Sequence, residues 1–319
     1  MKYAKIIASG SYLPQKVLTN HDLAQLVATT DEWIIARTGI RERHIVAENE
    51  TTSDMAYQAC LKAIAMAKIA PQQIDLIMVA TATPDSIFPS TACLLQHKLG
   101  IKTCAAFDLQ AACSGFIYAM TTADCYIKAG MATTVLVVGA DSMSRIVDYT
   151  DRGTCILFGD GAGAVILQAS DEAGILACDI RADGSFGSIL TSRGHLYNGL
   201  IKGNPYIYMD GQAVFKFAVK ALAAIAKDVL HKAGLTIDDI QWLIPHQANL
   251  RIIESTAKML GATMDKVVVT LAGHGNTSAA SIPLALDVAL RDGRIQSGDC
   301  ALLEGVGAGF TWGAIVVRF

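Results

Sequence analysis

The residue with the clearest chemical potential is a cysteine at the start of a predicted helix. Cys113 lies in segment 108–116 (DLQAACSGF), between a predicted strand at 105–109 and a predicted helix at 115–129. The free N–H groups and the dipole of a helix N-terminus favour the thiolate, which is the nucleophilic form of cysteine. The alternative is a small buried core residue, because the other seven cysteines need no chemical role.

Two further polar residues stand where other predicted elements begin or end. His246 follows the apolar segment 242–245 (WLIP), and Asn276 lies in segment 273–278 (GHGNTS) before a predicted helix. A structural histidine and a helix-capping asparagine are the alternatives. If the halves of the chain are duplicates, these residues converge with Cys113 in one cleft. A thiol, a neutral imidazole and a carboxamide suit acyl transfer through a thioester, in which the last two stabilise an enolate-like oxygen.

These residues must be positioned by alternating strands and helices. Apolar runs predict strands at 74–79, 105–109, 134–138, 165–167, 242–244, 267–269, 301–303 and 314–317. Helical periodicity predicts helices at 53–68, 115–129, 211–232, 250–260 and 282–291, with Gly130 closing the second. Continuous apolar strands between helices indicate a parallel-rich α/β sheet covered on both faces.

Short matches between the two halves of the chain suggest an internal duplication. Segments 159–163 (GDGAG) and 305–309 (GVGAG) run into strands, and segments 90–92 and 255–257 (both STA) precede helical stretches ending in Leu-Gly. We therefore predict halves at 1–170 and 171–319. The glycine runs read G-x-G-x-G rather than G-x-G-x-x-G, which favours tight turns and close backbone approach over a dinucleotide site.

Composition excludes several classes of protein. The chain has 319 residues, 52% of them hydrophobic and 17% charged, with a net charge of -3, which argues against a general nucleic-acid binder. No apolar run approaches the ~20 residues that span a bilayer, and the N-terminus lacks the apolar core of a signal peptide. The eight cysteines have no disulfide or metal-ligand spacing. We therefore expect reduced thiols and a cytoplasmic protein.

Basic residues gather on two predicted helix faces. Lys216, Lys220, Lys227 and His231 fall within roughly 60° of one another at 100° per residue. Arg251 and Lys258 share a second face. Solvated helix faces explain this pattern, and so does a surface for an acidic or phosphate-bearing partner.

The sequence resembles the β-ketoacyl-acyl carrier protein synthase III family over essentially its whole length. The matching segments are 31–33 (DEW), 37–40 (RTGI), 111–116 (AACSGF), 245–249 (PHQAN), 275–283 (GNTSAASIP) and 309–313 (GFTWG). A Cys-His-Asn set is typical of this family, whereas elongating ketoacyl synthases use Cys-His-His and thiolases add a second cysteine. The resemblance implies a thiolase-like α/β fold with duplicated halves in a five-layer αβαβα arrangement, and a homodimer. The first half carries the nucleophile and the second carries His246 and Asn276.

The same resemblance implies the reaction and the residues that perform it. Cys113 accepts a short acyl group, with acetyl expected, from acyl-CoA. His246 and Asn276 then promote decarboxylation of malonyl-acyl carrier protein, and the carbanion attacks the acyl-cysteine to give 3-oxoacyl-acyl carrier protein. The oxyanion donors are the backbone N–H groups of Cys113 and Ala308. Many relatives have glycine in place of Ala308, but alanine keeps the N–H if its φ is negative. No metal or redox cofactor is implied.

The resemblance also assigns binding residues. Trp33 and Arg152 sandwich the adenine of CoA, and the rest of the CoA path is lined by Arg37, Gly153, Phe215 and Asn249. The acidic carrier protein docks on basic and neighbouring residues, namely Gln247, Ala248, Asn249, Leu250, Arg251, Lys216 and Lys258. Phe88 reaches into the acyl pocket of the partner subunit.

Two other functions remain open from the sequence. One is a synthase III-like enzyme of secondary metabolism, of the quinolone or polyketide type, which would prefer a free CoA extender. The other is a non-catalytic acyl-binding relative, against which the intact Cys113, His246 and Asn276 set argues.

Overall fold

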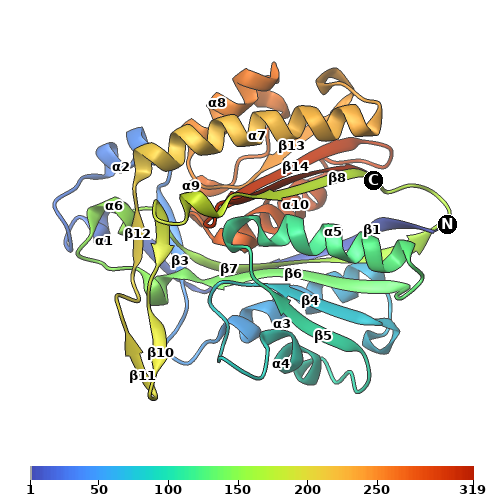
Figure 1. Ribbon diagram of the computed structural model, residues 1–319, viewed down its shortest axis with the longest axis horizontal. Helices are drawn as coiled ribbons and strands as arrows, with labels where there is room; N and C mark the ends of the chain where they lie inside the picture. The colour runs from blue at the N-terminus through green and yellow to red at the C-terminus, as the bar shows by residue number, and fades with distance from the viewer. Residues whose placement is uncertain (1) are drawn as a thin grey trace.

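The computed structural model describes residues 2–319 and builds them around two main β-sheets (Figure 1). The first sheet contains, in spatial order, β1 (Tyr3–Tyr12), β7 (Asp160–Ser170), β6 (Thr134–Ser142), β4 (Leu76–Ala80) and β5 (Ala105–Leu109). The second contains β13 (Trp242–Pro245), β14 (Cys300–Gly307), β15 (Thr311–Arg318) and β8 (Ile175–Ala182).

Helices cover both faces of each sheet and complete five layers. Two helices, α5 (Gly115–Lys128) and α10 (Ser281–Arg291), lie between the sheets. The outer face of the first sheet is covered by α3 (Thr52–Ala67) and α4 (Thr91–Lys98). The outer face of the second is covered by α7 (Gly211–Ala233) and α8 (Leu250–Leu260) (Figure 1). The expected thiolase-like αβαβα arrangement is confirmed.

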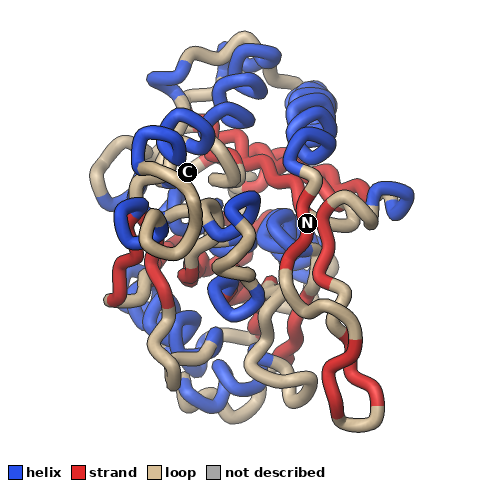
Figure 2. Tube along the Cα trace, turned by 90° about the vertical axis from the view of Figure 1, so that its left-hand side faces the viewer, coloured by secondary structure: helices blue, strands red, loops and turns tan. Residues whose placement is uncertain are grey.

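Shorter elements surround this framework. The short helices are α1 (Asn20–Leu23), α2 (Asp31–Thr38), α6 (Arg152–Cys155) and α9 (Leu271–His274). The paired short strands are β2 (Lys16–Thr19) with β3 (Glu42–Ile45), β9 (Leu190–Ser192) with β12 (Ile207–Met209), and β10 (His195–Tyr197) with β11 (Leu200–Lys202). The β10–β11 hairpin projects from the body of the molecule (Figure 2). The single-turn 3₁₀ helices are η1 (Pro71–Gln73), η2 (Ala112–Ser114), η3 (Met143–Ile146), η4 (Gly184–Phe186), η5 (Ile237–Asp239), η6 (Met264–Lys266) and η7 (Ser278–Ala280).

The two sheets repeat one topology. β4 pairs in parallel with β6, β6 pairs antiparallel with β7, and β7 pairs antiparallel with β1. β13 likewise pairs in parallel with β14, β14 pairs antiparallel with β15, and β15 pairs antiparallel with β8. Segment 267–269, predicted as a strand, forms only a bridge from Val267 to Leu243, in the place that β5 takes beside β4. This repeat supports a duplication, while the boundary at 170/171 stays a prediction.

Several details of the sequence interpretation were wrong. The sheets are mixed rather than parallel-rich, because four of the seven strand pairings that the main sheets form within residues 2–319 are antiparallel. Ser90 caps α4, but Ser255 lies inside α8 and precedes no helix. Gly305 and Gly307 belong to β14 instead of leading into β15.

Close backbone contact explains glycines of the central layer. A β-carbon on Gly139 of β6 would lie 2.2 Å from the carbonyl oxygen of Ala279 in η7. On Gly163 of β7 it would lie 2.7 Å from Cβ of Pro283 in α10. These glycines let the turn before α10 press against the first sheet.

Two further expectations concern the cysteines and membrane-spanning helices. All eight cysteines are free in the described chain. Between residues 2 and 319, no helix combines the length and apolar character needed to cross a membrane. Location in the cytoplasm stays a prediction.

Candidate active site

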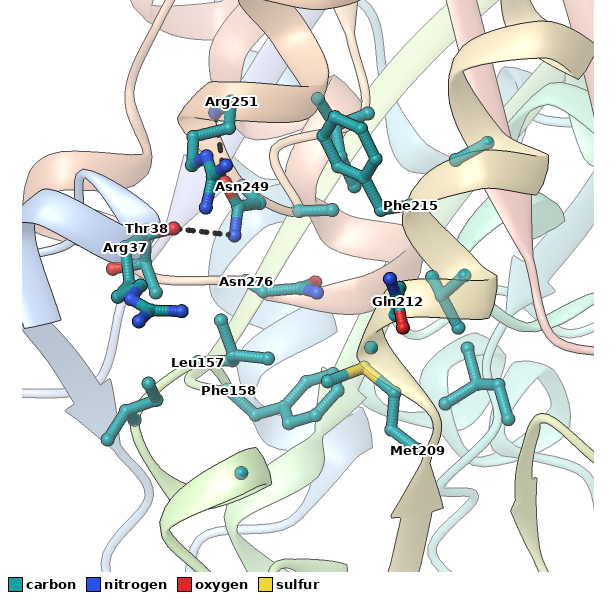
Figure 3. A pocket seen from close by; sticks show the side chains of 18 of the residues that line it. Arg37, Thr38, Leu157, Phe158, Met209, Gln212, Phe215, Asn249, Arg251 and Asn276 are labelled. Atoms are coloured by element: carbon teal, nitrogen blue, oxygen red, sulfur yellow. Dashed lines mark hydrogen bonds between the residues drawn. The ribbon is translucent and has the colours of Figure 1, made fainter.

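The three residues singled out by their chemistry line one cavity of about 730 Å³. Cys113 lies in η2, immediately before α5. His246 follows β13, and Asn276 lies between α9 and η7 (Figure 3 shows Asn276). All three side chains are buried. The structure therefore brings together residues that are up to 163 positions apart in the sequence, counting from Cys113 to Asn276.

The turn that carries Cys113 is held by tight contacts. The hydroxyls of Ser114 and Thr311 donate to the carbonyl oxygen of Ala111 at 2.9 and 3.0 Å. Gly307, at the end of β14, packs so closely that a β-carbon would lie 2.6 Å from the backbone nitrogen of Cys113. Burial raises the pKa of the Cys113 thiol to about 12. Burial thus opposes the helix N-terminus expected to favour the thiolate, so the thiol is protonated at neutral pH.

His246 is held as a neutral side chain. Its backbone N–H donates to the carbonyl oxygen of Glu304 at 2.8 Å, and its Nδ1 lies 2.6 Å from the hydroxyl of Ser281. Burial lowers the pKa of the imidazole to about 3. The ring is therefore uncharged throughout the physiological pH range, as the sequence interpretation assumed.

The carboxamide of Asn276 has a defined orientation. Its Oδ1 accepts a hydrogen bond from the backbone N–H of Ser278 at 3.0 Å. Its backbone N–H donates to the carbonyl oxygen of Leu157 at 2.8 Å. Because Oδ1 is the acceptor, the amide nitrogen Nδ2 is left as the donor for a group in the cavity.

Aromatic and basic side chains form the mouth of the cavity. The guanidinium carbon of Arg152 lies 4.7 Å from the centre of the Trp33 ring, and that of Arg37 lies 5.2 Å from it. A flat ring inserted between Trp33 and Arg152 needs about 7 Å, twice the usual ~3.5 Å contact distance. Arg152 must therefore move to admit an adenine.

Other expected binding residues line the same cavity. These are Gly153, Phe215, Lys216, Ala248, Asn249 and Arg251. Asn249 caps α8 through its Oδ1 and donates from Nδ2 to the carbonyl oxygen of Arg37 at 3.1 Å, which ties α8 to α2 (Figure 3). Leu250, Lys258, Ala308 and Phe88 lie outside the cavity lining.

The expectation that Gln247 contacts a docked partner is wrong. Its side chain is 0% exposed and donates to the carbonyl oxygens of Pro245 and Val268 at 2.8 and 3.0 Å. Its Oε1 accepts from the backbone N–H of Thr270 at 2.8 Å. Gln247 thus joins β13 to the segment before α9.

The basic helix faces are exposed beside the cavity. Lys216, Lys220, Lys227 and His231 are exposed on α7, and Arg251 and Lys258 are exposed on α8, which packs against α7. Arg251 lies 6.0 Å from the centre of the Phe215 ring at the cavity mouth. The basic side chains predicted to share these faces are therefore exposed on both helices, with exposed Glu254 between Arg251 and Lys258 on α8.

Sequence reasoning missed several residues of the site. Apolar lining residues include Leu157, Phe158, Met209 and Phe310, which carry no chemical signal in the sequence. Ser281 was inside the GNTSAASIP segment, but its contact with His246 depends on the fold. Within residues 2–319, no cluster of three or more His, Cys, Asp or Glu side chains is suited to a metal ion.

Two models of one protein family match the chain. The models described as 3-oxoacyl-[acyl-carrier-protein (ACP)] synthase III and its C-terminal part match residues 107–184 and 230–319. The chain is 59% identical, over 100% of both sequences, to a β-ketoacyl-[acyl-carrier-protein] synthase III of Neisseria gonorrhoeae (strain NCCP11945).

Solved structures are also similar to the chain over nearly its whole length. The 3-oxoacyl-[acyl-carrier-protein] synthase III of Aquifex aeolicus VF5 has 48% identity and a TM-score of 0.93, covering 99% of this chain and 100% of that one. The priming β-ketosynthase of the R1128 polyketide pathway has 35% identity and a TM-score of 0.95, covering 100% and 96%.

Proposed function

The chain belongs to the β-ketoacyl-acyl carrier protein synthase III family, and from this premise we propose that Cys113, His246 and Asn276 perform its condensation reaction. The protein is an acyltransferase that starts fatty-acid synthesis by condensing a short acyl-CoA with malonyl-acyl carrier protein. The convergence of a thiol, a neutral imidazole and a carboxamide in one buried cavity is the observation that carries the assignment of roles.

Acylation of Cys113 is the first half of the reaction. The sulfur attacks the thioester carbonyl of acyl-CoA, the acyl–sulfur bond to CoA breaks, and the thiol proton leaves with CoA. The developing oxyanion is stabilised by the backbone N–H groups of Cys113 and Ala308. The φ of Ala308 is not positive, which meets the condition set from the sequence.

Decarboxylation and condensation form the second half. In the proposed tautomer the Ser281 hydroxyl, which accepts from the backbone N–H of Gln247 at 3.3 Å, donates its own proton to Nδ1 of His246, and the ring proton lies on Nε2. Nε2–H of His246 and Nδ2–H of Asn276 donate to the malonyl thioester oxygen. CO₂ leaves, the carbanion attacks the acyl carbonyl, and the Cys113 sulfur departs and regains a proton. Neutral donors suit this step, because a charged imidazolium would be costly in so buried a site.

The substrates approach from the cavity mouth. Trp33 and a displaced Arg152 hold the adenine of CoA, while Arg37, Gly153, Phe215 and Asn249 line its path. The acidic carrier protein docks on Lys216, Arg251 and Lys258, with Ala248, Asn249 and Leu250 beside them. No metal or redox cofactor takes part in these steps.

A homodimer completes the acyl pocket. Phe88 is 82% exposed and its neighbour Ile87 is 72% exposed, in the loop between β4 and α4. Two adjacent apolar side chains with this much exposure are typical of a surface that a partner covers. We propose that Phe88 enters the acyl pocket of a second copy.

The alternatives are less well supported. Identity to the synthase III of Neisseria gonorrhoeae is 59%, against 35% to the R1128 priming β-ketosynthase. The intact catalytic set gives no support to a non-catalytic relative.

The mechanism is tested by intact-mass measurement. After mixing with acetyl-CoA, the protein is expected to gain one acetyl group on Cys113, and malonyl-acyl carrier protein is expected to remove it with release of CO₂. Cys113→Ala is the control and should gain no mass. Failure to acylate with acetyl-, longer or branched acyl-CoAs would overturn the proposal.

A charge-reversal experiment tests the docking surface. Lys216→Glu with Arg251→Glu changes the local charge by four units, so KM for malonyl-acyl carrier protein should rise at least tenfold at low salt. Acylation by acetyl-CoA should be impaired less, because both residues line the cavity mouth but the carrier protein presents far more negative charge than CoA. Steady-state kinetics at two salt concentrations measure both.

The matched control for this experiment is Lys68→Glu with Arg318→Glu. Both residues are exposed and outside the cavity lining, and the change in net charge is the same. An equal loss in this control, or equal losses in both half-reactions of the test variant, would contradict carrier-protein docking at Lys216 and Arg251.

A further inference from the structure

Ser278 combines two unfavourable features beside the nucleophile. It begins η7 with φ of +51°, a left-handed conformation that is uncommon for any residue except glycine. Its hydroxyl is buried and has no hydrogen-bond partner of normal geometry within residues 2–319. Native proteins rarely keep a buried hydroxyl unpaired, so the hydroxyl needs a reason.

The duplicated topology shows that the backbone turn does not need this hydroxyl. η2 leads directly into α5, as η7 leads directly into α10. Ala112 begins η2 with φ of +45°, so it is the counterpart of Ser278. Alanine therefore adopts the same turn in the other half of the molecule.

Ser278 lies in a turn that packs against the turn of the nucleophile. η7 packs against η2, which carries Cys113, and against β6, which carries Asp141. Burial raises the pKa of both the Cys113 thiol and the Asp141 carboxyl, and Ser278 lies close enough to each group to oppose that rise. Both oxygens of Asp141 have donors other than Ser278: Oδ1 accepts from the backbone N–H of Ala82 at 2.7 Å, and Oδ2 accepts from that of Ala279 at 3.0 Å. Asp141 therefore does not depend on the Ser278 hydroxyl, whose proton can turn to the sulfur when the sulfur is charged.

Resting on the proposed role of Cys113 as acyl acceptor, we propose that Ser278 is a further catalytic residue, whose hydroxyl donates a hydrogen bond to the Cys113 sulfur when it carries negative charge. That charge develops as the thiol loses its proton during acylation, and it returns when the sulfur departs after condensation. The bond adds a fixed donor to the stabilisation from the start of α5.

Other titratable groups around the thiol do not supply this donor. The charge of Asp141 on β6 raises the pKa of the thiol instead of lowering it. His246, in the same cavity, does not titrate above acid pH. Glu304 on β14 is buried, and burial raises its pKa to about 8. Its carboxyl is therefore protonated at neutral pH, and Glu304 is not among the groups that shift the pKa of the thiol.

The test is the pH dependence of Cys113 alkylation by iodoacetamide, followed by peptide mapping at Cys113. In Ser278→Ala the apparent pKa of the thiol should rise by about one unit, because a hydrogen bond to a charged group has roughly that strength. The alkylation rate at a fixed pH below that pKa should fall about three- to tenfold, since the freed thiolate is also more nucleophilic. Ser278→Gly suits the positive φ and should give the same shift.

Thr256→Val is the matched control. Thr256 lies in α8, outside the cavity lining, and its hydroxyl is also buried without a partner within residues 2–319. Its profile should overlay that of the unmodified protein, and overlaid profiles for Ser278→Ala and Ser278→Gly would overturn the proposal. Alkylation uses no substrate, so a failure of acetyl-CoA to acylate the unmodified protein would instead count against the proposed function.

Discussion

Replacing His246 with alanine is expected to slow decarboxylation of the malonyl thioester severely while Cys113 still accepts an acyl group. His246 is neutral and buried, so its role is to donate one hydrogen bond to an oxygen that gains charge as CO₂ leaves. Removing one such donor from a preorganised site typically slows the step about 10²- to 10³-fold. Release of labelled CO₂ measures decarboxylation, and intact mass after mixing with acetyl-CoA measures acylation.

A conservative variant separates hydrogen bonding from packing. His246→Gln keeps a neutral N–H donor and should retain more decarboxylation than His246→Ala, whereas a purely structural role would give equal losses. The proposed role of His246 in decarboxylation rather than acylation would be contradicted if His246→Ala blocked acylation and left CO₂ release intact.

Local sequence signals predicted the elements that position the site. The prediction of a strand at 105–109 and a helix at 250–260 matches β5 and α8 at both ends. These elements have strong markers, such as Asn249 capping α8 and Gly261 ending it in the left-handed conformation. Cys113 and His246 were found because they follow strands whose carboxyl ends face one cleft.

Long-range features could not be predicted from local patterns. The direction of β7 depends on its pairing with β1, far away in the sequence, which no local pattern showed. β15, in contrast, follows β14 after residues 308–310 alone, and the parallel-rich prediction overlooked this hairpin. Gln247 sits in a polar segment typical of a surface, yet the segment before α9 folds over it. The contact of Ser281 with His246 likewise needs α10 to lie against the end of β13.

Glu304 is the most unusual group that the sequence did not mark. It follows three apolar residues in β14 and is fully buried, and neither carboxyl oxygen has a hydrogen-bond partner within residues 2–319. Burial raises its pKa from the usual 4.5 to about 8. The folded state therefore holds a proton that the unfolded chain releases above pH 4.5, so stability falls as pH rises from about 4.5 to 8.

Glu304→Gln is expected to remove this pH dependence, because the amide has nearly the same shape and does not titrate. Each pKa unit corresponds to about 1.4 kcal/mol, so the variant should gain about 3 kcal/mol relative to the unmodified protein between pH 5 and pH 7. Urea unfolding at half-unit pH intervals measures the difference, with exposed Glu254→Gln as the control that stays flat. A constant difference across this range would mean that Glu304 has an ordinary pKa in the folded protein, because a donor such as a buried water stabilises its carboxylate. A difference that grows with pH would mean that the Glu304 carboxyl is neutral in the folded protein. The same residue holds His246, because its backbone carbonyl accepts from the His246 N–H.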